Sequence, residues 1–318
     1  METLLITGGS GYLGRSLAKH FKNDFKVIIC SRNQKALGIA GLELGVESAP
    51  LDVTNYEQCY ELFLRYKPDV VIHAAATKFV DISEKFPTEC IDVNINGSRN
   101  IALASVATGV RHVVGISTDK AAAPIENIYG LSKAVMEKTF QTLNRFHETN
   151  FSCVRYGNVV WSTGSVFPIW KKMLRDSGVI SSTGSNLSRF FFKVDDAVGL
   201  IATALQHETT VAGNILSIPM KGVTMSRILD IWTSQVGKTW EAAPSRQGDR
   251  FEEFLIAENE ISRTRTLDLN GSNFYLIESQ NKGSYSELSA PVSSSSVEQM
   301  SDEEIANLLF ESVPESEQ

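Results

Sequence analysis

The chain has 318 residues, of which 42% are hydrophobic, so it is long enough to bury a full core. The formal net charge is -7 at pH 7, and residues 298–318 hold seven acidic residues with no Lys or Arg. The rest of the chain is therefore near neutral and lacks the basic face that nucleic-acid binding requires. We expect no nucleic-acid partner.

The four cysteines are scattered, with no C-x-x-C pair and no nearby pair of histidines. This spacing predicts neither a metal site nor a disulfide framework, and indicates small core side chains in a reducing compartment. The N-terminus leads directly into a strand and a glycine loop, which leaves no room for a signal peptide. With no apolar run of about 18 residues, we expect a cytoplasmic protein with no membrane partner.

The first pattern in the chain is a strand, a glycine turn and a helix. Residues 3–7 (TLLIT) are followed by GGSGYLG, in which Gly8, Gly11 and Gly14 are spaced three apart before an amphipathic helix. Glycines let a pyrophosphate approach the backbone, and the free N–H groups of a helix start attract its charge. The pattern predicts a dinucleotide site that also includes Tyr12 and Leu13.

A second strand, residues 25–31, ends in Ser31 and is followed by Arg32. In a dinucleotide site this position meets the adenosine ribose, where an acidic residue suits a 2′-hydroxyl and an Arg suits a 2′-phosphate. Arg32 therefore favours NADP over NAD, although a solvated surface Arg is the alternative. A third strand, residues 46–51, leads to Asp52 and Val53, which we expect near the adenine.

Residues 70–72 form a β-branched strand that runs into His73, Ala74, Ala75 and Ala76. Small residues at a strand end suit close approach by a cofactor. Strands alternate with helices from residue 3 to residue 155, which predicts an α/β fold with a doubly wound parallel sheet of the Rossmann type and right-handed crossovers.

The segment 117–138 holds two reactive clusters, Thr118-Asp119-Lys120 and the Tyr-x-x-x-Lys pair of Tyr129 and Lys133. It follows an apolar strand, and ligands of open α/β sheets collect beyond the carboxyl ends of the strands. If Tyr129 opens a helix, Lys133 lies one turn further on the same face, where its ammonium favours the phenolate. These residues are the candidate catalytic groups.

Beyond residue 156 the alternation changes, and we predict three parts. Residues 1–160 form the NADP-binding domain, to which late elements near 190–220 return, and residues 161–281 are mainly a substrate-binding portion. Residues 282–318 are expected to form a mobile Ser-rich linker and an acidic C-terminal helix, which begins with a capping box of Ser301 and Glu304.

The glycine loop together with Tyr129 and Lys133 resembles the extended short-chain dehydrogenase/reductases. A narrower resemblance rests on HAAATKFVDISEKFPTECIDVNINGSRNI, STDKA, VRYGNVVWSTGSVFPIWKK, SRFFFKVDDAV and RQGDRFEEFLI. These segments are similar to those of the inverting UDP-N-acetylglucosamine 4,6-dehydratases of the polysaccharide-biosynthesis family, over roughly residues 1 to 265.

That resemblance implies a reaction and its catalytic groups. Tyr129 and Lys133 would oxidise C4 of the sugar with NADP as hydride acceptor, which acidifies the proton on C5. Asp119 would act as the acid and Lys120 as the base of water elimination, with a Lys120 pKa lowered by burial beside other cations. Hydride return to C6 and protonation of C5 from the opposite face would follow. Homo-oligomers are common in this family.

The resemblance also implies contacts with a UDP-sugar substrate. Arg189 and Arg246 would clamp the diphosphate, Asn158 would donate a hydrogen bond to it, and Glu253 would take the uridine ribose hydroxyls. Lys78 would approach the sugar. For the two arginines, surface ion pairs are the alternative.

Three departures from the family pattern lie near these residues. The loop between Asp119 and Tyr129 is one residue longer, Phe79 stands where the family usually has His, and Thr163 where it usually has Arg. Two other functions stay open: a nucleotide-sugar 4-epimerase or reductase, and a non-catalytic NADP-binding regulatory protein.

Overall fold

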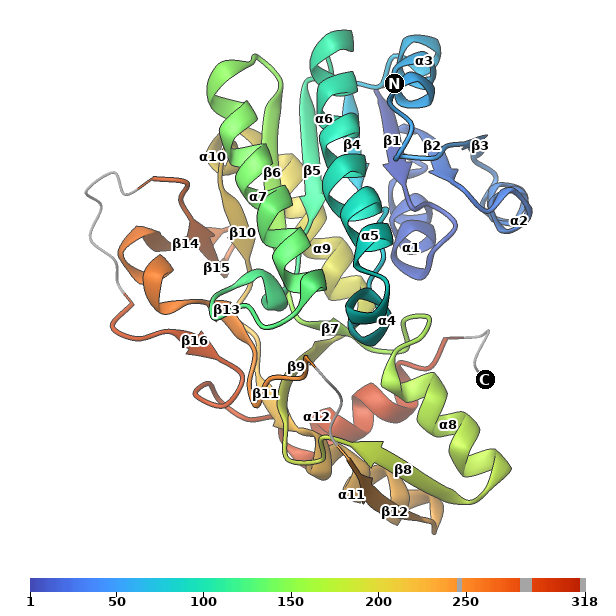
Figure 1. Cartoon of the computed structure of the whole chain (residues 1–318), viewed down its shortest axis with the longest axis vertical. Helices are drawn as coiled ribbons and strands as arrows, with labels where there is room; N and C mark the ends of the chain where they lie inside the picture. The colour runs from blue at the N-terminus through green and yellow to red at the C-terminus, as the bar shows by residue number, and fades with distance from the viewer. Residues whose placement is uncertain (245–247, 281–287, 315–318) are drawn as a thin grey trace.

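The computed structural model describes residues 1–244, 248–280 and 288–314 (Figure 1). Its centre is a nine-stranded sheet. In spatial order the strands are β14 (Thr264–Leu269), β15 (Ser272–Ile277), β10 (Ile215–Ser217), β6 (Asn150–Arg155), β5 (His112–Ile116), β4 (Val70–His73), β1 (Thr3–Thr7), β2 (Lys26–Ser31) and β3 (Glu47–Pro50). Neighbours from β10 to β3 are all parallel, which confirms the predicted doubly wound sheet.

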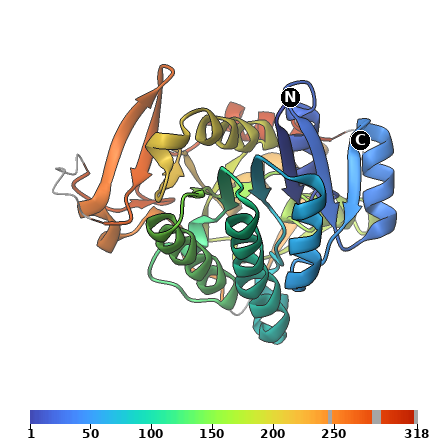
Figure 2. The same cartoon turned by 90° about the horizontal axis from the view of Figure 1, so that it is seen from above.

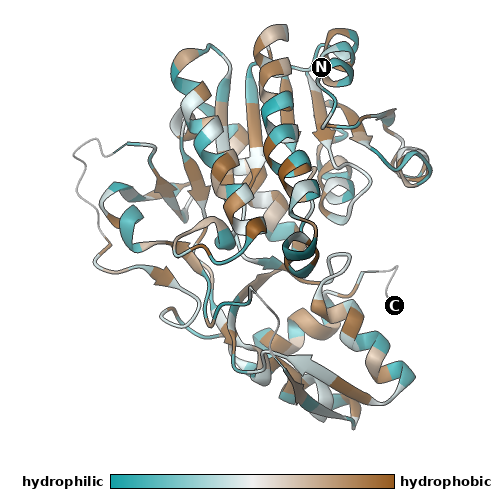
Figure 3. Cartoon of the chain, viewed as in Figure 1, coloured by the Kyte–Doolittle hydropathy of each residue, from teal (hydrophilic) through white to brown (hydrophobic). Residues whose placement is uncertain are grey.

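Helices cover both faces of this sheet (Figure 2). On one face α6 (Gly97–Thr108) packs against α3 (Tyr56–Tyr66) and α7 (Ile128–Phe146), and on the other α1 (Tyr12–Phe21) packs against α2 (Gln34–Leu44) and α9 (Val194–Gln206). Because both faces are covered, the central strands are mostly apolar in their inner residues, as Figure 3 shows for the middle of the sheet. Leu4, Leu5 and Ile6 of β1 are fully buried.

Strands β14 and β15 form an antiparallel hairpin that extends the sheet beyond β10. The sequence did not indicate this hairpin, because residues 264–277 lie far along the chain from the parallel strands that they join. The short elements that complete this part are α4 (Val80–Lys85), α5 (Pro87–Cys90), a π-helical turn (Ile91–Asn96), 3₁₀ turns at Asp119–Ala121 and Glu258–Arg263, and α10 (Glu208–Val211).

A second, smaller core lies below the carboxyl ends of the parallel strands in Figure 1. It is built on aromatic side chains, among which Trp161, Phe167, Trp170 and Trp232 contact one another. Its elements are α8 (Val166–Asp176), α11 (Met225–Val236), a sheet of β11 (Gly222–Thr224), β9 (Ser188–Phe192) and β7 (Asn158–Val159), and the pair β8 (Val179–Thr183) with β12 (Thr239–Ala243). The division of the chain at residue 160 stays a prediction.

The Ser-rich stretch differs from the expected linker. Strand β16 (Val292–Ser293) pairs with β13 (Phe254–Ile256), and Ser294 is fully buried. The neighbouring serines bond to one another, since the Ser293 hydroxyl donates to Ser296 Oγ at 3.0 Å. The run of serines predicts a mobile linker, whereas in the structure its backbone pairs with a strand. Residues 282–287 of the expected linker lie outside the described residues.

The C-terminal helical segment is confirmed. Helix α12 (Asp302–Ala306) begins with the predicted capping box of Ser301 and Glu304, and a π-helical turn (Asn307–Glu311) continues it. Ile305, Leu308 and Leu309 are buried in the second core. Across the three described ranges, no helix has both the length and the apolar character that a membrane crossing needs.

Candidate active site

One large cavity, of about 800 Å³, runs from the glycine turn to the second core. It opens at the carboxyl ends of β1, β2, β4 and β5, where ligands of such sheets bind. The expected site residues that line it are Gly8, Gly11, Tyr12, Leu13, Gly14, Ser31, Arg32, Val53, Ala74, Ala75, Ala76, Lys78, Thr118, Lys120, Tyr129, Lys133, Asn158 and Arg189. The other expected site residues, Asp52, Asp119 and Glu253, do not line the cavity. Arg246 lies outside the described residues.

The glycine turn is shaped to bring backbone close to a ligand. Gly8 has a φ of +69°, in the left-handed region, and a Cβ added to Gly14 would lie 2.4 Å from Gly8 O. Helix α1 starts at Tyr12 without a side-chain cap, so its first N–H groups are free to bind an anion. The turn therefore fits the pyrophosphate of a dinucleotide.

Arg32 and Asp52 lie beyond β2 and β3 with different surroundings. Arg32 lines the cavity and is 3.6 Å from Glu89 of α5, with both side chains about half exposed. Asp52 instead accepts hydrogen bonds from the backbone N–H and the hydroxyl of Thr54, at 3.0 and 2.8 Å. Its carboxylate shapes the turn after β3, so its adenine contact stays a prediction without support from this geometry.

The two reactive clusters meet at one place on the cavity wall. Asp119 opens a 3₁₀ turn after β5, and its Oδ1 accepts from Thr118 Oγ1 at 2.9 Å and from Lys120 Nζ at 3.1 Å. Asp119 is fully buried and its Oδ2 has no hydrogen-bond partner. Burial, with a contribution from Glu253, raises the pKa of the Asp119 carboxyl. A raised pKa makes the carboxyl bind a proton more readily, which suits an acid.

Lys120 differs from the sequence expectation. Burial lowers its pKa, but the carboxylates of Asp119 and Glu253 outweigh burial, so the Lys120 pKa is raised. Its Nζ lies 3.3 Å from Glu253 Oε1 and 3.5 Å from Asn158 Oδ1. The predicted lowering by neighbouring cations is wrong for this arrangement, because the two carboxylates raise the Lys120 pKa by more than burial and Arg189 lower it.

Tyr129 and Lys133 lie one turn apart on α7, as predicted. Asn127 caps this helix, since its Oδ1 accepts from the Gly130 N–H at 2.8 Å. Burial lowers the pKa of Lys133 to about 8, while burial followed by Asp119 raises that of Tyr129. Lys133 Nζ donates to Met136 Sδ at 3.8 Å. The phenolate that Lys133 was expected to favour is therefore not the resting form here.

Arg189 and Glu253 are interior groups. Arg189 is 7% exposed and donates to the carbonyl oxygens of Ser188 and Arg250 at 2.7 and 2.9 Å, which excludes the surface-pair alternative for this residue. Glu253 is 2% exposed and pairs with Lys120, Arg189 and Arg250. Because this carboxylate is already paired with three cationic groups, the structure does not support the expected contact between Glu253 and a uridine ribose.

Arg250 is a residue whose role the sequence did not reveal. It is 4% exposed, and its guanidinium donates to the carbonyl oxygens of Ala122 and Pro124 and to Glu253. It thereby holds the loop between Asp119 and Tyr129, which is one residue longer than the family pattern. The position of this loop is therefore fixed by a residue from a distant part of the chain.

Phe79 and Thr163, the other departures, both line the cavity. The Phe79 ring lies against Gly164, where an added Cβ would approach Phe79 Cε1 to 2.2 Å. Two loops from opposite sides of the cavity therefore touch at this point. Lys78 is beside it, with Nζ 6.0 Å from the centre of the Phe79 ring. Among the described residues no group of three or more His, Cys, Asp or Glu side chains suits a metal ion.

This fold and site define an enzyme of the short-chain dehydrogenase/reductase superfamily. Residues 4–269 match the family described as "Polysaccharide biosynthesis protein", and the chain belongs to that family. Both resemblances stated from the sequence are confirmed.

Two relatives of similar length carry different names. The chain is 31% identical to a UDP-N-acetylglucosamine 4,6-dehydratase (inverting) of Campylobacter jejuni, over 87% of this chain and 82% of that one. It is 32% identical to a UDP-glucose 4-epimerase of Rickettsia conorii, over 84% and 81%. A Bacillus subtilis relative, "Probable polysaccharide biosynthesis protein EpsC", is 30% identical over 82% of this chain, which spans only 46% of that protein.

Solved structures agree on the fold. The structure of Pen from Bacillus thuringiensis has a TM-score of 0.89 and 25% identity, and covers 98% of this chain and 97% of its own. DesIV, a dTDP-glucose 4,6-dehydratase from Streptomyces venezuelae solved with NAD bound, has a TM-score of 0.70 and 21% identity, over 78% and 86%.

Proposed function

We propose that this protein is a nucleotide-sugar 4,6-dehydratase that acts on UDP-N-acetylglucosamine in the synthesis of polysaccharide precursors. The observation that carries the proposal is that Lys120, Tyr129 and Lys133 line one cavity, and that Asp119 is paired with Lys120 directly behind this lining. Oxidation of an alcohol needs only the second pair. An elimination needs an acid and a base as well, and the first pair supplies them.

The cofactor in this proposal is NADP. The glycine turn and the uncapped start of α1 fit its pyrophosphate, and Arg32 fits a 2′-phosphate. When bound, a nicotinamide dinucleotide supplies hydride acceptance and hydride return. The preference is tested by direct titration: Arg32→Ala should weaken NADP binding and leave NAD binding unchanged, and equal loss for both would contradict the assignment.

Tyr129 receives the proton of the C4 hydroxyl as that carbon is oxidised. Burial raises the pKa of the phenol, so Tyr129 does not rest as a phenolate. It has to release its own proton, to neutral Lys133, as it takes up the proton of the hydroxyl. Lys133, with a pKa of about 8, is able to take up and release a proton near neutral pH, and it lies one turn away on α7. Thr118 lies between Tyr129 and Asp119 and donates to the carboxyl of Asp119.

The ketone at C4 acidifies the proton on C5, which Lys120 removes, and Asp119 protonates the departing C6 hydroxyl. Asp119 is prepared for this by its raised pKa. Lys120 has to reach its neutral form first, and Asp119 Oδ1, 3.1 Å away, is the nearest acceptor for its proton. Transfer of that one proton turns the ion pair into a neutral acid and a neutral base, so the same pair serves both halves of the elimination.

For the substrate diphosphate, Arg189 and Asn158 line the cavity, and Arg246 is a further candidate outside the described residues. Lys78 lies at the sugar side in this assignment. The test is incubation with UDP-N-acetylglucosamine and a small panel of UDP- and dTDP-sugars, with products identified by NMR. A 4-keto-6-deoxy product from UDP-N-acetylglucosamine is expected, and retention of the C6 hydroxyl by a folded, cofactor-binding protein would refute the proposal.

A 4-epimerase is the second candidate, favoured by the relative of that name at 32% identity. An epimerase needs Tyr129 and Lys133 but has no use for Lys120 as a base. Lys120→Ala separates the two: loss of turnover supports the dehydratase, and survival of turnover supports the epimerase. A non-catalytic regulatory protein is the third candidate, and it requires that Tyr129→Phe behave as wild type in every turnover assay.

A further inference from the structure

The family resemblance implies that Glu253 binds the ribose of the substrate, but its surroundings in the structure indicate another role. Glu253 Oε1 lies 3.3 Å from Lys120 Nζ and 3.8 Å from Arg189 Nε. Its Oε2 accepts from Arg250 Nε at 3.0 Å. Both oxygens are therefore in use, and the side chain is 2% exposed.

The backbone of Glu253 is also fixed. Its N–H donates to Ser294 Oγ at 3.1 Å, and its carbonyl oxygen accepts from the Ser294 N–H at 2.9 Å. Ser294 is fully buried beside β16, the strand that replaces the expected linker. The carboxylate is thus held from both sides, by the C-terminal region and by Arg250.

Glu253 pairs with two cavity-lining groups, Lys120 and Arg189, and Lys120 is the nearer of the two. An ammonium has three donors, and Lys120 Nζ has three acceptors around it: Asp119 Oδ1 at 3.1 Å, Glu253 Oε1 at 3.3 Å and Asn158 Oδ1 at 3.5 Å. Three acceptors fix the direction of the ammonium. Removal of one of them leaves Nζ free to turn away from the cavity.

We propose that Glu253 is a positioning residue that orients Lys120 and holds its charge, rather than a ligand of the substrate ribose. The part of this inference that treats Lys120 as the base rests on the proposed dehydration. The contact between Glu253 and Lys120 does not depend on it. Glu253 acts through Lys120 and does not touch the reacting atoms. When Asp119 carries a proton, Glu253 remains as the counter-charge of the Lys120 ammonium.

The charges that face Lys120 come from several elements. Asp119 lies on the same 3₁₀ turn, Glu253 precedes β13, Arg189 comes from β9, and Tyr129 comes from α7, which packs against that turn. Of these, Glu253 is the one acidic group supplied from outside the turn itself. The substitution Glu253→Gln removes a negative charge next to Lys120 and leaves the positive charge of Arg189 in place. The pKa of Lys120 therefore falls, and its neutral form is populated at lower pH.

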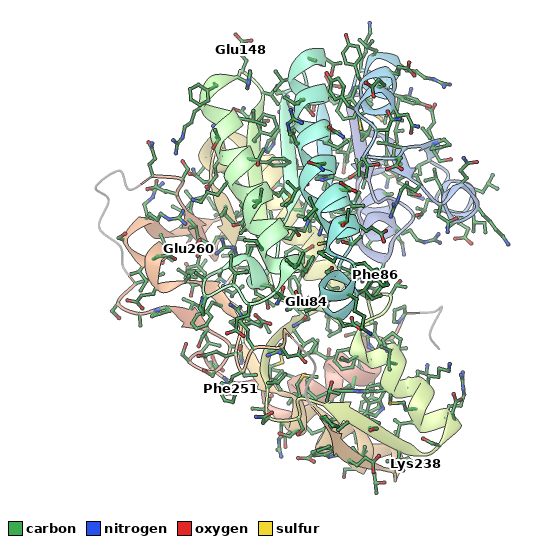
Figure 4. All side chains as sticks on the ribbon, in the orientation of Figure 1. Glu84, Phe86, Glu148, Lys238, Phe251 and Glu260 are labelled. Atoms are coloured by element: carbon green, nitrogen blue, oxygen red, sulfur yellow. The ribbon has the colours of Figure 1, made fainter. Side chains whose placement is uncertain are left out.

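The first experiment measures thermal unfolding of the full chain and does not depend on activity. The variants are Glu253→Gln, Lys120→Met and the two together, with Glu260→Gln as the matched control. Glu260, labelled in Figure 4, is also a buried carboxylate paired with an arginine, Arg155, and it has no described contact with Lys120. Non-additive loss of Tm for Glu253 with Lys120, and additive loss for Glu260 with Lys120, is expected. Additive loss in both cycles would overturn the inference.

The second experiment measures the binding of UDP and 2′-deoxy-UDP to wild type and Glu253→Gln. Equal effects of the substitution on the two ligands are expected. A loss confined to UDP would show a ribose contact and overturn the inference. If Glu253→Gln does not fold, Glu253→Asp, which keeps the charge, replaces it in the same comparison.

The third experiment uses turnover. We expect Glu253→Gln to lower kcat by about 10- to 100-fold, because misdirection of a catalytic group by about 1 Å has that effect. The ascending limb of the kcat profile should move to lower pH by about one pH unit, while KM changes little. A raised KM with unmoved limbs would contradict the inference. Absence of dehydration in wild type would refute the proposed function, and the unfolding cycle and the UDP comparison would still decide the role of Glu253.

Discussion

Asp119 Oδ1 lies 3.1 Å from Lys120 Nζ, and this ion pair is joined to the second half of the chain through Glu253. Both partners are buried, with side chains 0% and 13% exposed. The acid and the base of the proposed elimination are therefore already in contact in the absence of substrate. Transfer of one proton from Lys120 to Asp119 gives the protonated acid and the neutral base together.

Asp119→Asn should stop dehydration while the fold survives. The amide keeps an acceptor for Thr118 and Lys120 but has no proton to give to the leaving hydroxyl. Loss of a positioned acid costs about 10²- to 10⁴-fold in kcat. Kinetics with NMR product detection measure this, with the exposed Asp24→Asn as the control. Turnover within threefold or so of wild type, the scale of an ordinary surface change, would show that Asp119 is not the acid.

Gly14→Ala should abolish dinucleotide binding. The new Cβ would lie 2.4 Å from Gly8 O and 2.6 Å from Gly9 Cα, so the turn that cradles the pyrophosphate has to move. Gly38→Ala is the matched control, because a Cβ there meets nothing within 4 Å and lies in α2. We expect the control to bind as wild type and to be stabilised by roughly 0.5–1 kcal/mol. Equal binding by both variants in a fluorescence titration would remove the glycine turn from the cofactor site.

Lys133→Met should stabilise the protein at pH 7. Burial lowers the pKa of Lys133 from 10.5 to about 8, so the folded chain binds fewer protons than the unfolded chain between these values. Stability therefore rises as pH increases from about 8 to 10.5 in wild type, and the variant lacks this rise. The gain at pH 7 is roughly 3 kcal/mol at about 1.4 kcal/mol for each pKa unit.

Chemical denaturation at pH 7 and pH 10 measures this difference, with the exposed Lys35→Met as the control. A gain of the same size at both pH values would trace the effect to packing and not to charge.

Arg155→Met should be strongly destabilising. Arg155 is 1% exposed and bonds to Glu137 at 3.0 Å and to Glu260 at 3.0 Å, so its loss leaves two buried carboxylates unpaired. Removal of one partner of such a pair costs about 3–5 kcal/mol. Arg227→Met, which breaks an exposed pair with Asp302, should leave the free energy of unfolding nearly unchanged. Similar losses in both variants would mean that burial of the network contributes nothing.

The sequence predicted the features that depend on local patterns. The strand, glycine turn and helix at residues 3–21 need only neighbouring residues, and so does the spacing that puts Tyr129 and Lys133 on one face of α7. The capping box of Ser301 with Glu304 is local in the same way. Each of these appears in the structure as expected.

What the sequence could not supply are contacts between distant segments. The pKa of Lys120 depends on Glu253, and the position of the loop before Tyr129 depends on Arg250. The serines at 293–296 predict a mobile linker, because no local pattern indicates that β13 pairs with this stretch. The hydrogen bond that the Ile128 N–H donates to Glu84 of α4, at 2.7 Å, is another contact between distant segments that local sequence patterns do not predict; Glu84 is labelled in Figure 4.

The most direct test of the central claim is the reaction with UDP-N-acetylglucosamine in D₂O, followed by NMR. Elimination across C5 and C6 removes the C5 proton, so protonation of that carbon afterwards takes deuterium from the solvent. The dehydratase account predicts a product with a C6 methyl group and deuterium at C5. With Lys120→Ala it predicts neither the methyl group nor the deuterium. A product that keeps its C6 hydroxymethyl group and carries no deuterium at C5 would contradict it.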